Sequence, residues 1–214
     1  IITTVAGTGP GLSGDGGPAL DATLTSPGGV AALPDGSYLI ADTANHRIRR
    51  VAPDGIITTV AGTGPGLSGD GGPATSAQLS SPRIVVALAD GSYLIADSGN
   101  GRLRRVDQNG IITTLAAGLT GPRGVTPTAD GGLLIADTGG GRILRRAPDG
   151  TMTQIAGLGL GFAADGASLR STGLSAPTDV VPLGNGGLLI ADAGTDRLRR
   201  VTPLGAGFTV AGGR

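Results

Sequence analysis

Residues 26–62 read SPGGVAALPDGSYLIADTANHRIRRVAPDGIITTVAG, and this stretch decides the fold. It contains four short runs of strand-forming residues, which we expect at 28–33, 37–41, 47–51 and 56–61. The runs are joined by "PDG", "TANH" and "PDG", which are connections of hairpin length made of turn-forming residues. The stretch therefore predicts one antiparallel sheet of four strands in meander order.

The same pattern occurs four times along the chain. Its phrase "IAD" places four aspartates in register, at spacings of 55, 40 and 55 residues: Asp42, Asp97, Asp137 and Asp192. A single four-stranded sheet cannot bury both of its apolar faces, but copies stacked around an axis cover one another. We therefore predict an all-β fold, a β-propeller of four four-stranded antiparallel blades in a single domain over 1–214. The repeats run about 1–55, 56–110, 111–150 and 151–205, with 206–214 as an extra outer strand.

The composition narrows the classes of partner. The 214 residues include sixteen basic and sixteen acidic residues, all of them Arg and Asp, so the net charge is zero. A balanced charge and only four aromatic residues argue against nucleic-acid binding. We expect the paired arginines of the third strands to pack their stems between blades, with their heads reaching solvent or aspartate. The chain has no cysteine and no apolar run long enough to span a membrane.

Residues 26–62 resemble the NHL repeat, and the insertion "GTGPGLSGDGGPA" is similar to the longer form common in bacterial members. The resemblance covers nearly the whole chain and implies a propeller that binds proteins, RNA or small ligands, with a minority of members acting as lyases or hydrolases. The third repeat departs from the pattern, because it lacks the insertion and has Gly140 where the family has Asn.

The number of outer strands does not match the number of blades. Five segments fit the fourth strand, at 1–5, 56–60, 111–115, 151–155 and 208–211. If the first segment closes the last blade, the C-terminal one is surplus; if the last blade uses its own strand, the first is. A spare exposed strand favours a fragment of a larger ring or a homo-oligomer formed through that strand, with a closed four-bladed ring as the alternative.

Three long loops should share one face of the propeller. The first nineteen residues recur unchanged at 56–74, and the insertions lie at 8–26, 63–81 and 158–176. Each would cross from the rim of one blade to the centre of the next, on the side that carries the connections between second and third strands. One carboxylate per insertion is too few for a calcium site, so we expect the glycines to serve turns.

A recurrent Asp-x4-Arg spacing suits an ion pair across the turn between the second and third strands. Because it occurs in every repeat, it indicates a structural clasp rather than a catalytic site. The predicted pairs are Asp42 with Arg47, Asp97 with Arg102, Asp137 with Arg142, and Asp192 with Arg197.

Residues that differ between equivalent positions are better candidates for function. Arg83, Arg123 and Asp179 begin inner strands near the expected channel mouth, where the arginines could hold a carboxylate or phosphate and Asp179 could select among ligands. The alternative is that these groups pair with each other or with neighbouring loops. His46 is the single histidine; it is either a packed turn residue or a ligand-binding residue at the same mouth.

These observations favour a non-enzymatic interaction or scaffold propeller that binds a protein or small anionic ligand through its long-loop face. A metal-assisted hydrolase or lyase is the first alternative, and a purely structural fragment or multi-chain ring is the second. With one His, no Glu and no Cys, we expect no cofactor and no metal. The elaborated loops favour an extracellular or cell-envelope location.

Overall fold

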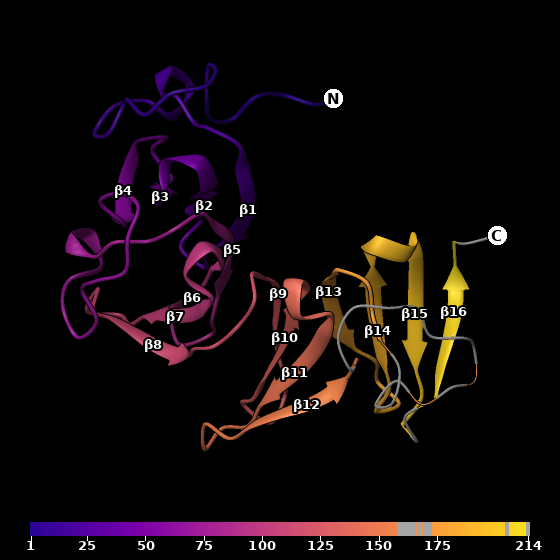
Figure 1. The fold of residues 1–214 in the computed structure, drawn as a ribbon. Helices are drawn as coiled ribbons and strands as arrows, with labels where there is room; N and C mark the ends of the chain where they lie inside the picture. The colour runs from indigo at the N-terminus through magenta and orange to yellow at the C-terminus, as the bar shows by residue number, and fades with distance from the viewer. Residues whose placement is uncertain (158–165, 167, 169–172, 204–205, 213–214) are drawn as a thin grey trace. The chain divides into compact units, whose positions relative to one another are not determined.

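The computed structural model describes residues 1–157, 166, 168, 173–203 and 206–212. These residues form sixteen strands in four antiparallel sheets of four strands each (Figure 1). Within every sheet the strands follow one another in chain order, so each sheet is a meander. The helical segments of the described residues are three-residue 3-10 turns. The prediction of an all-β fold with four four-stranded blades is confirmed.

We number the sheets as blades 1 to 4 in chain order. Blade 1 contains β1 (Pro27–Ala32), β2 (Tyr38–Asp42), β3 (Arg47–Val51) and β4 (Ile57–Ala61). Blade 2 contains β5 (Pro82–Ala87), β6 (Tyr93–Asp97), β7 (Arg102–Val106) and β8 (Ile112–Ala116). Blade 3 contains β9 (Pro122–Pro127), β10 (Leu133–Asp137), β11 (Arg142–Arg146) and β12 (Met152–Ala156). Blade 4 contains β13 (Pro177–Pro182), β14 (Leu188–Asp192), β15 (Arg197–Val201) and β16 (Gly207–Ala211).

The 3-10 turns lie in two kinds of place. η1 (Ala19–Asp21) and η3 (Ala74–Ser76) lie in the first two insertions. The other four connect the second and third strands of a blade: η2 (Thr43–Asn45), η4 (Ser98–Asn100), η5 (Thr138–Gly140) and η6 (Ala193–Thr195).

The last blade uses its own outer strand. β16 pairs with β15 in the same register that joins β4 to β3. Residues 1–5 form no strand in the structure, although their sequence repeats at 56–60. Of the two expected alternatives, the structure therefore has the one in which residues 1–5 are left over, because the third strand of a blade is the partner that an outer strand needs, and every third strand here is paired.

The chain divides into two compact units, residues 1–117 with blades 1 and 2 and residues 118–214 with blades 3 and 4, and we describe each by itself. In each unit the inner strands of the two blades are in contact, β1 with β5 and β9 with β13. Glycine allows this approach: a Cβ atom on Gly28 would lie 2.6 Å from the Arg83 carbonyl oxygen, and one on Gly124 would lie 2.7 Å from that of Thr178.

The turn between second and third strands has the same conformation in all four blades. Each begins after the aspartate that ends the second strand and finishes on a residue in the left-handed region, where φ is 57° for His46 and 55° for Asp196. Gly101 and Gly141 occupy this position in blades 2 and 3, both with φ 59°. The two non-glycine residues therefore accept backbone strain that the glycines avoid.

Candidate functional site

The first two insertions, which precede blades 1 and 2, follow the same path and also cover a sheet edge. The first one also pairs with the outer edge of blade 1, where the Gly16 N–H donates to the Ile57 carbonyl (2.8 Å) and the Ile57 N–H donates to that of Gly17 (3.0 Å). The second insertion repeats this at Ile112, through Gly71 and Gly72, with distances of 2.8 and 3.0 Å. Each insertion therefore covers the beginning of an outer strand that would otherwise be an open sheet edge.

A buried arginine of the third strand forms an ion pair with each of these insertions. Arg49 and Arg104 lie on the third strands of blades 1 and 2, and their side chains are 0% exposed. Arg49 donates to the carboxylate of Asp15 in the first insertion (2.7 Å), and Arg104 donates in the same way to Asp70 (2.7 Å). A fully buried guanidinium requires such partners, because an unpaired buried charge is strongly destabilising.

The aspartate at the end of each second strand completes this network in blades 1 and 2. Asp42 lies 3.5 Å from Arg49 and is itself fully buried. It accepts further hydrogen bonds from the Asn45 side-chain amide and the Thr25 N–H, each at 2.8 Å. Asn45 also donates to the Gly11 carbonyl (2.6 Å), so the turn, the insertion and the strand are tied together.

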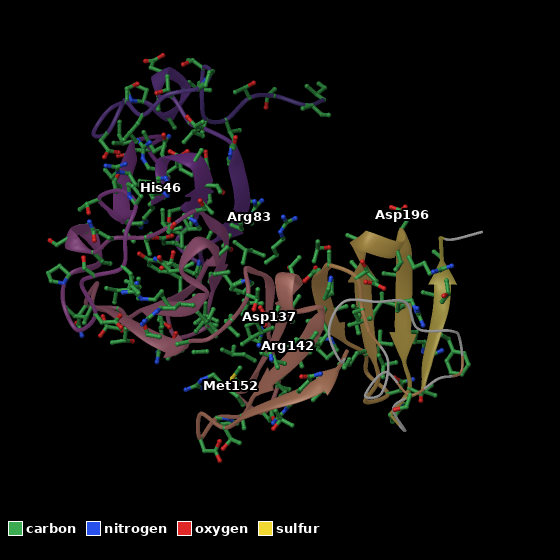
Figure 2. All side chains as sticks on the ribbon, in the orientation of Figure 1. His46, Arg83, Asp137, Arg142, Met152 and Asp196 are labelled. Carbon is green, nitrogen blue, oxygen red and sulfur yellow. The ribbon has the colours of Figure 1, made fainter. Side chains whose placement is uncertain are left out.

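The predicted Asp-x4-Arg pair is a direct ion pair in blade 3, whereas in blades 1 and 2 the arginine takes other partners; in blade 4 the Arg197 charge acts on the Asp192 carboxylate. In blade 3, Arg142 donates through Nε to Asp137 Oδ2 at 2.8 Å, and Figure 2 labels both residues. In blade 1, Arg47 instead donates to the Asn45 and Thr63 carbonyls, at 2.8 and 2.7 Å.

Blades 2 and 4 also supply other donors to this aspartate. In blade 2, Asp97 is bonded to Asn100 (2.8 Å) and Arg104 (3.5 Å), and Arg102 reaches Thr114 (3.4 Å). In blade 4, Asp192 accepts from the Thr195 hydroxyl (2.8 Å) and the Ser175 N–H (2.7 Å).

Gly140 explains why blade 3 differs. A Cβ atom at this position would lie 2.7 Å from Asp137 Oδ2 and 3.0 Å from Arg142 Nε. Without a side chain here, Arg142 occupies the place that the Asn45 or Asn100 amide takes in blades 1 and 2. The buried arginine is also missing from blade 3, because Leu144 stands at its position.

Burial perturbs the acidity of two of these aspartates. Burial raises the pKa of Asp97 above its ordinary value, and hydrogen bonds from Asn100 and Ser80 together with the Arg104 charge offset part of this effect. Burial also raises the pKa of Asp192, against the opposing effects of Thr195, Ser175 and Arg199. The network therefore carries an electrostatic cost of desolvation.

Sequence reasoning did not predict that any of these arginines would be fully buried, since it expected their heads to reach solvent or aspartate. The interpretation suits the second member of each pair: Arg50 and Arg105 make partly exposed ion pairs with Asp35 (2.5 Å) and Asp90 (2.6 Å). In blades 1 and 2 the first member is fully buried and its head reaches aspartate, so the expectation of a solvated role is wrong for these two arginines while that of an aspartate partner is met. A signal was present, because the one repeat without an insertion aspartate is also the one with Leu144 in place of arginine.

The clamped insertions present an apolar side chain at one shared position. Leu12 is 46% exposed and its counterpart Leu67 is 45% exposed. Most of the third insertion, 158–176, lies outside the described residues. These loops lie on the side of the blades that also carries the turns between second and third strands. We call this side the loop-bearing face.

The proposed channel-mouth residues are exposed but fall into different units. Arg83 lies on β5 of the first unit, and Arg123 lies on β9 of the second (Arg83 is labelled in Figure 2). Asp179 belongs to the second unit with Arg123, where its Oδ1 accepts the Val180 N–H (2.9 Å) and faces Gly124. A joint anion site of Arg83 and Arg123 stays a prediction.

His46 is held by its backbone and one ring nitrogen. Its Nδ1 accepts the Ser81 N–H at 2.9 Å, which joins the turn of blade 1 to the start of β5. Among the residues the structure describes, no group of three His, Cys, Asp or Glu side chains could hold a metal ion. No helix within the described ranges has the length and apolar character of a membrane span.

Comparison with known proteins gives the class to which this arrangement belongs. A chain of the nidogen/laminin complex matches with a TM-score of 0.65 at 22% identity, over 90% of this chain and 67% of that one. A streptogramin B lyase matches with a TM-score of 0.63 at 16% identity, over 89% of this chain and 56% of that one. At these identities the likeness concerns the fold, and the four sheets are blades of the β-propeller type.

The sequence comparisons find an NHL repeat in this chain and relatives that match part of it. Residues 24–51 match the NHL repeat. Teneurin-4 of Homo sapiens is 36% identical over 105 residues, and the chloroplastic protein SUPPRESSOR OF QUENCHING 1 of Arabidopsis thaliana is 34% identical over 87 residues. These alignments cover 42% and 40% of this chain but only 4% and 8% of the relatives' lengths. The match supports the prediction of NHL-type blades in a β-propeller.

Proposed function

We propose that this chain is a non-enzymatic protein-interaction or scaffold propeller, which binds a protein partner through its loop-bearing face. The observation that carries the proposal is the pair of insertions clamped by buried arginines, each presenting an exposed leucine, Leu12 or Leu67, from the same place.

Rigid loops suit recognition because less conformational entropy is lost when the partner binds. Here each insertion is tied to the blade by an ion pair, by backbone hydrogen bonds to the outer strand and by the turn asparagine. An apolar side chain on such a fixed backbone can enter a partner's pocket, and the many glycines around it leave room for close approach.

The family relatives support a protein partner in a general way. One of the structural neighbours is a complex of nidogen with laminin. This chain spans about one twenty-fifth of the teneurins it matches, so the activities of those whole proteins carry no further weight here.

The proposal can be tested with a photo-crosslinking amino acid in place of Leu67, in the cells that make the protein. We expect a defined protein adduct that disappears when Leu12→Ser is added, because both leucines would contact one partner. The crosslinker placed at the exposed Thr58 of β4 should give no such adduct. Phe208→Ser serves as the matched control, since Phe208 is 41% exposed on β16 and lies outside the proposed face. Adducts that are equal at both positions, or that survive Leu12→Ser, would overturn the proposal.

Three further expectations from the sequence stay open to experiment. An anion site at the channel mouth predicts that Arg83→Ala with Arg123→Ala weakens binding of inorganic phosphate without lowering the melting temperature. A homo-oligomer predicts a solution mass above that of the 20.7 kDa chain. The alternative, a metal-assisted hydrolase or lyase, predicts that elemental analysis of the purified protein finds a stoichiometric metal.

A further inference from the structure

The first unit contains a pocket of about 580 Å³ between blades 1 and 2. It lies at the end of the blades that carries the β1–β2 and β3–β4 turns, where Thr75 of the second insertion also lines it. Its apolar walls come from both blades: Leu33, Pro34, Leu39, Val60, Tyr93 and Val106. This size and lining are those of a small-molecule site.

The polar groups of the pocket carry an excess of negative charge. Asp35 and Arg50 line it as an ion pair of 2.5 Å, with both side chains partly exposed to solvent. Asp107 lines it as well, and its Oδ1 accepts only the local Asn109 and Ile111 N–H groups, at 2.9 and 2.8 Å. Within the described residues Asp107 makes no ion pair. One carboxylate therefore lacks a cationic partner at the edge of an apolar pocket.

The second unit has a pocket at the equivalent place, but that pocket has no counterpart of the unpaired carboxylate of Asp107. That pocket is about 300 Å³ and is again lined by an Asp–Arg pair, Asp130 with Arg145. Thr202 stands where blade 2 has Asp107, and Leu188 stands where blade 2 has Tyr93. Blades 1 and 3 have alanine, Ala52 and Ala147, at the position of Asp107. The acidic group is therefore particular to one pocket and is no part of the general blade pattern.

We propose that the pocket between blades 1 and 2 binds an organic cation, a ligand with an apolar body and one ammonium group. The apolar body lies against Leu33, Val60 and Val106, and the ammonium group pairs with Asp107. The pocket includes neither Leu12 nor Leu67, so failure of this site would leave the proposed protein interaction untouched.

Tyrosine fluorescence gives a local readout, because the chain has two tyrosines and no tryptophan. In a Tyr38→Phe background, Tyr93 in the pocket wall is the single reporter. We expect hexylammonium to change its emission saturably and to bind about three- to tenfold more tightly than hexanol, with hexanoate weaker than both, as for a partly exposed ion pair. Equal binding of the three probes, or no saturable change, would overturn the proposal.

Asp107→Asn tests the assigned partner. The asparagine oxygen can still accept the Asn109 and Ile111 N–H groups, so the turn should be preserved. We expect hexylammonium affinity to fall to that of hexanol, while hexanol affinity stays the same. Asp54→Asn is the matched control, because Asp54 lies in the corresponding β3–β4 turn of blade 1 and does not line the pocket. If both variants lower hexylammonium affinity equally, the effect is a general one of net charge and the site is wrong.

Amide chemical shifts in the unmodified protein provide a second measurement. Hexylammonium should shift the N–H signals of pocket residues such as Leu33, Val60 and Gly110, and those of the second unit should not move. Shifts spread over both units would contradict a single site.

Discussion

Blades 2 and 3 share the segment LIAD and the same four-strand pairing, but they bury different side chains at one position of the third strand. Blade 2 buries the charged Arg104 between Asp70 of the insertion and Asp97 of its own strand, whereas blade 3 has Leu144 at the same place. Blade 3 also lacks the insertion and the turn asparagine. The insertion and the arginine are therefore present together or absent together, which indicates that they act jointly to anchor the loop, whereas the turn residue varies, because blade 4 has the insertion and Arg199 but Thr195 in place of asparagine.

The largest expected effect comes from making blade 2 like blade 3 at one position only. Arg104→Leu would leave Asp70 and the buried Asp97 without their cation, and we expect the free energy of unfolding to fall by about 3–5 kcal/mol. Urea denaturation measures this change. Arg105→Leu, which removes a partly exposed pair with Asp90, should cost less than about 1 kcal/mol. A similar loss in both variants would show that burial does not distinguish the two arginines.

The outer edges of the two blades should differ in hydrogen exchange. The Ile112 N–H of blade 2 donates to the Gly72 carbonyl of the insertion. Its counterpart Met152, on the β12 edge of blade 3 (Figure 2), is 38% exposed and lies beside no insertion in the described structure. We expect the Met152 amide to exchange on the order of 100-fold faster than that of Ile112, as measured by NMR. Equal rates would mean that the insertion does not protect the edge.

A smaller effect is expected from Gly140→Asn, which restores the turn asparagine to blade 3. The new side chain would displace Arg142 from Asp137, and a neutral donor would replace a charged one. We expect a loss of about 1 kcal/mol in the free energy of unfolding. Arg142→Ala should then cost less in the Gly140→Asn background than in the original protein. Additive losses in this double-mutant cycle would mean that the two side chains do not compete for Asp137.

The smallest expected effect concerns acid stability, where the two blades should behave alike. A hydrogen bond from the Ser92 hydroxyl lowers the pKa of Asp90 below 3.8, and one from the Thr128 hydroxyl does the same for Asp130. Their contribution to stability is therefore present above pH 3.8 and lost as the pH falls through the lowered values. Asp90→Asn and Asp130→Asn should each lower the melting temperature at pH 6 and approach the original protein near pH 2.

The pKa of Asp97 is shifted in the opposite direction from those of Asp90 and Asp130, and this shift provides the internal control for those measurements. Because burial raises its pKa, the folded state binds a proton more readily than the unfolded state, and ionisation of Asp97 opposes folding as the pH rises. Carboxyl NMR titration should place Asp97 above 3.8 and Asp90 below it. The reverse order would contradict the described geometry.

Much of the fold could be predicted from the sequence, because turn residues at fixed offsets determine strand pairing. The predicted strand at 47–51 matches β3, and the other strands of blade 1 differ by one residue at one or both ends. The arginine network could not be predicted in the same way. Arg47 and Arg49 are two positions apart and point to the same side of β3, so the spacing from Asp42 favours neither. Arg49 is the arginine that becomes buried because it pairs with Asp15, which lies far away in sequence.

The first seven residues, IITTVAG, have a consequence for how the chain folds. The same heptapeptide recurs at 56–62, so β3 of blade 1 meets two chemically identical partners during folding. β4 follows β3 after only five residues, whereas thirty-nine residues separate the first copy from β3. Closing the shorter loop is favoured by about 2 kcal/mol of chain entropy. Proximity along the chain, and not side-chain chemistry, selects the strand that completes the blade.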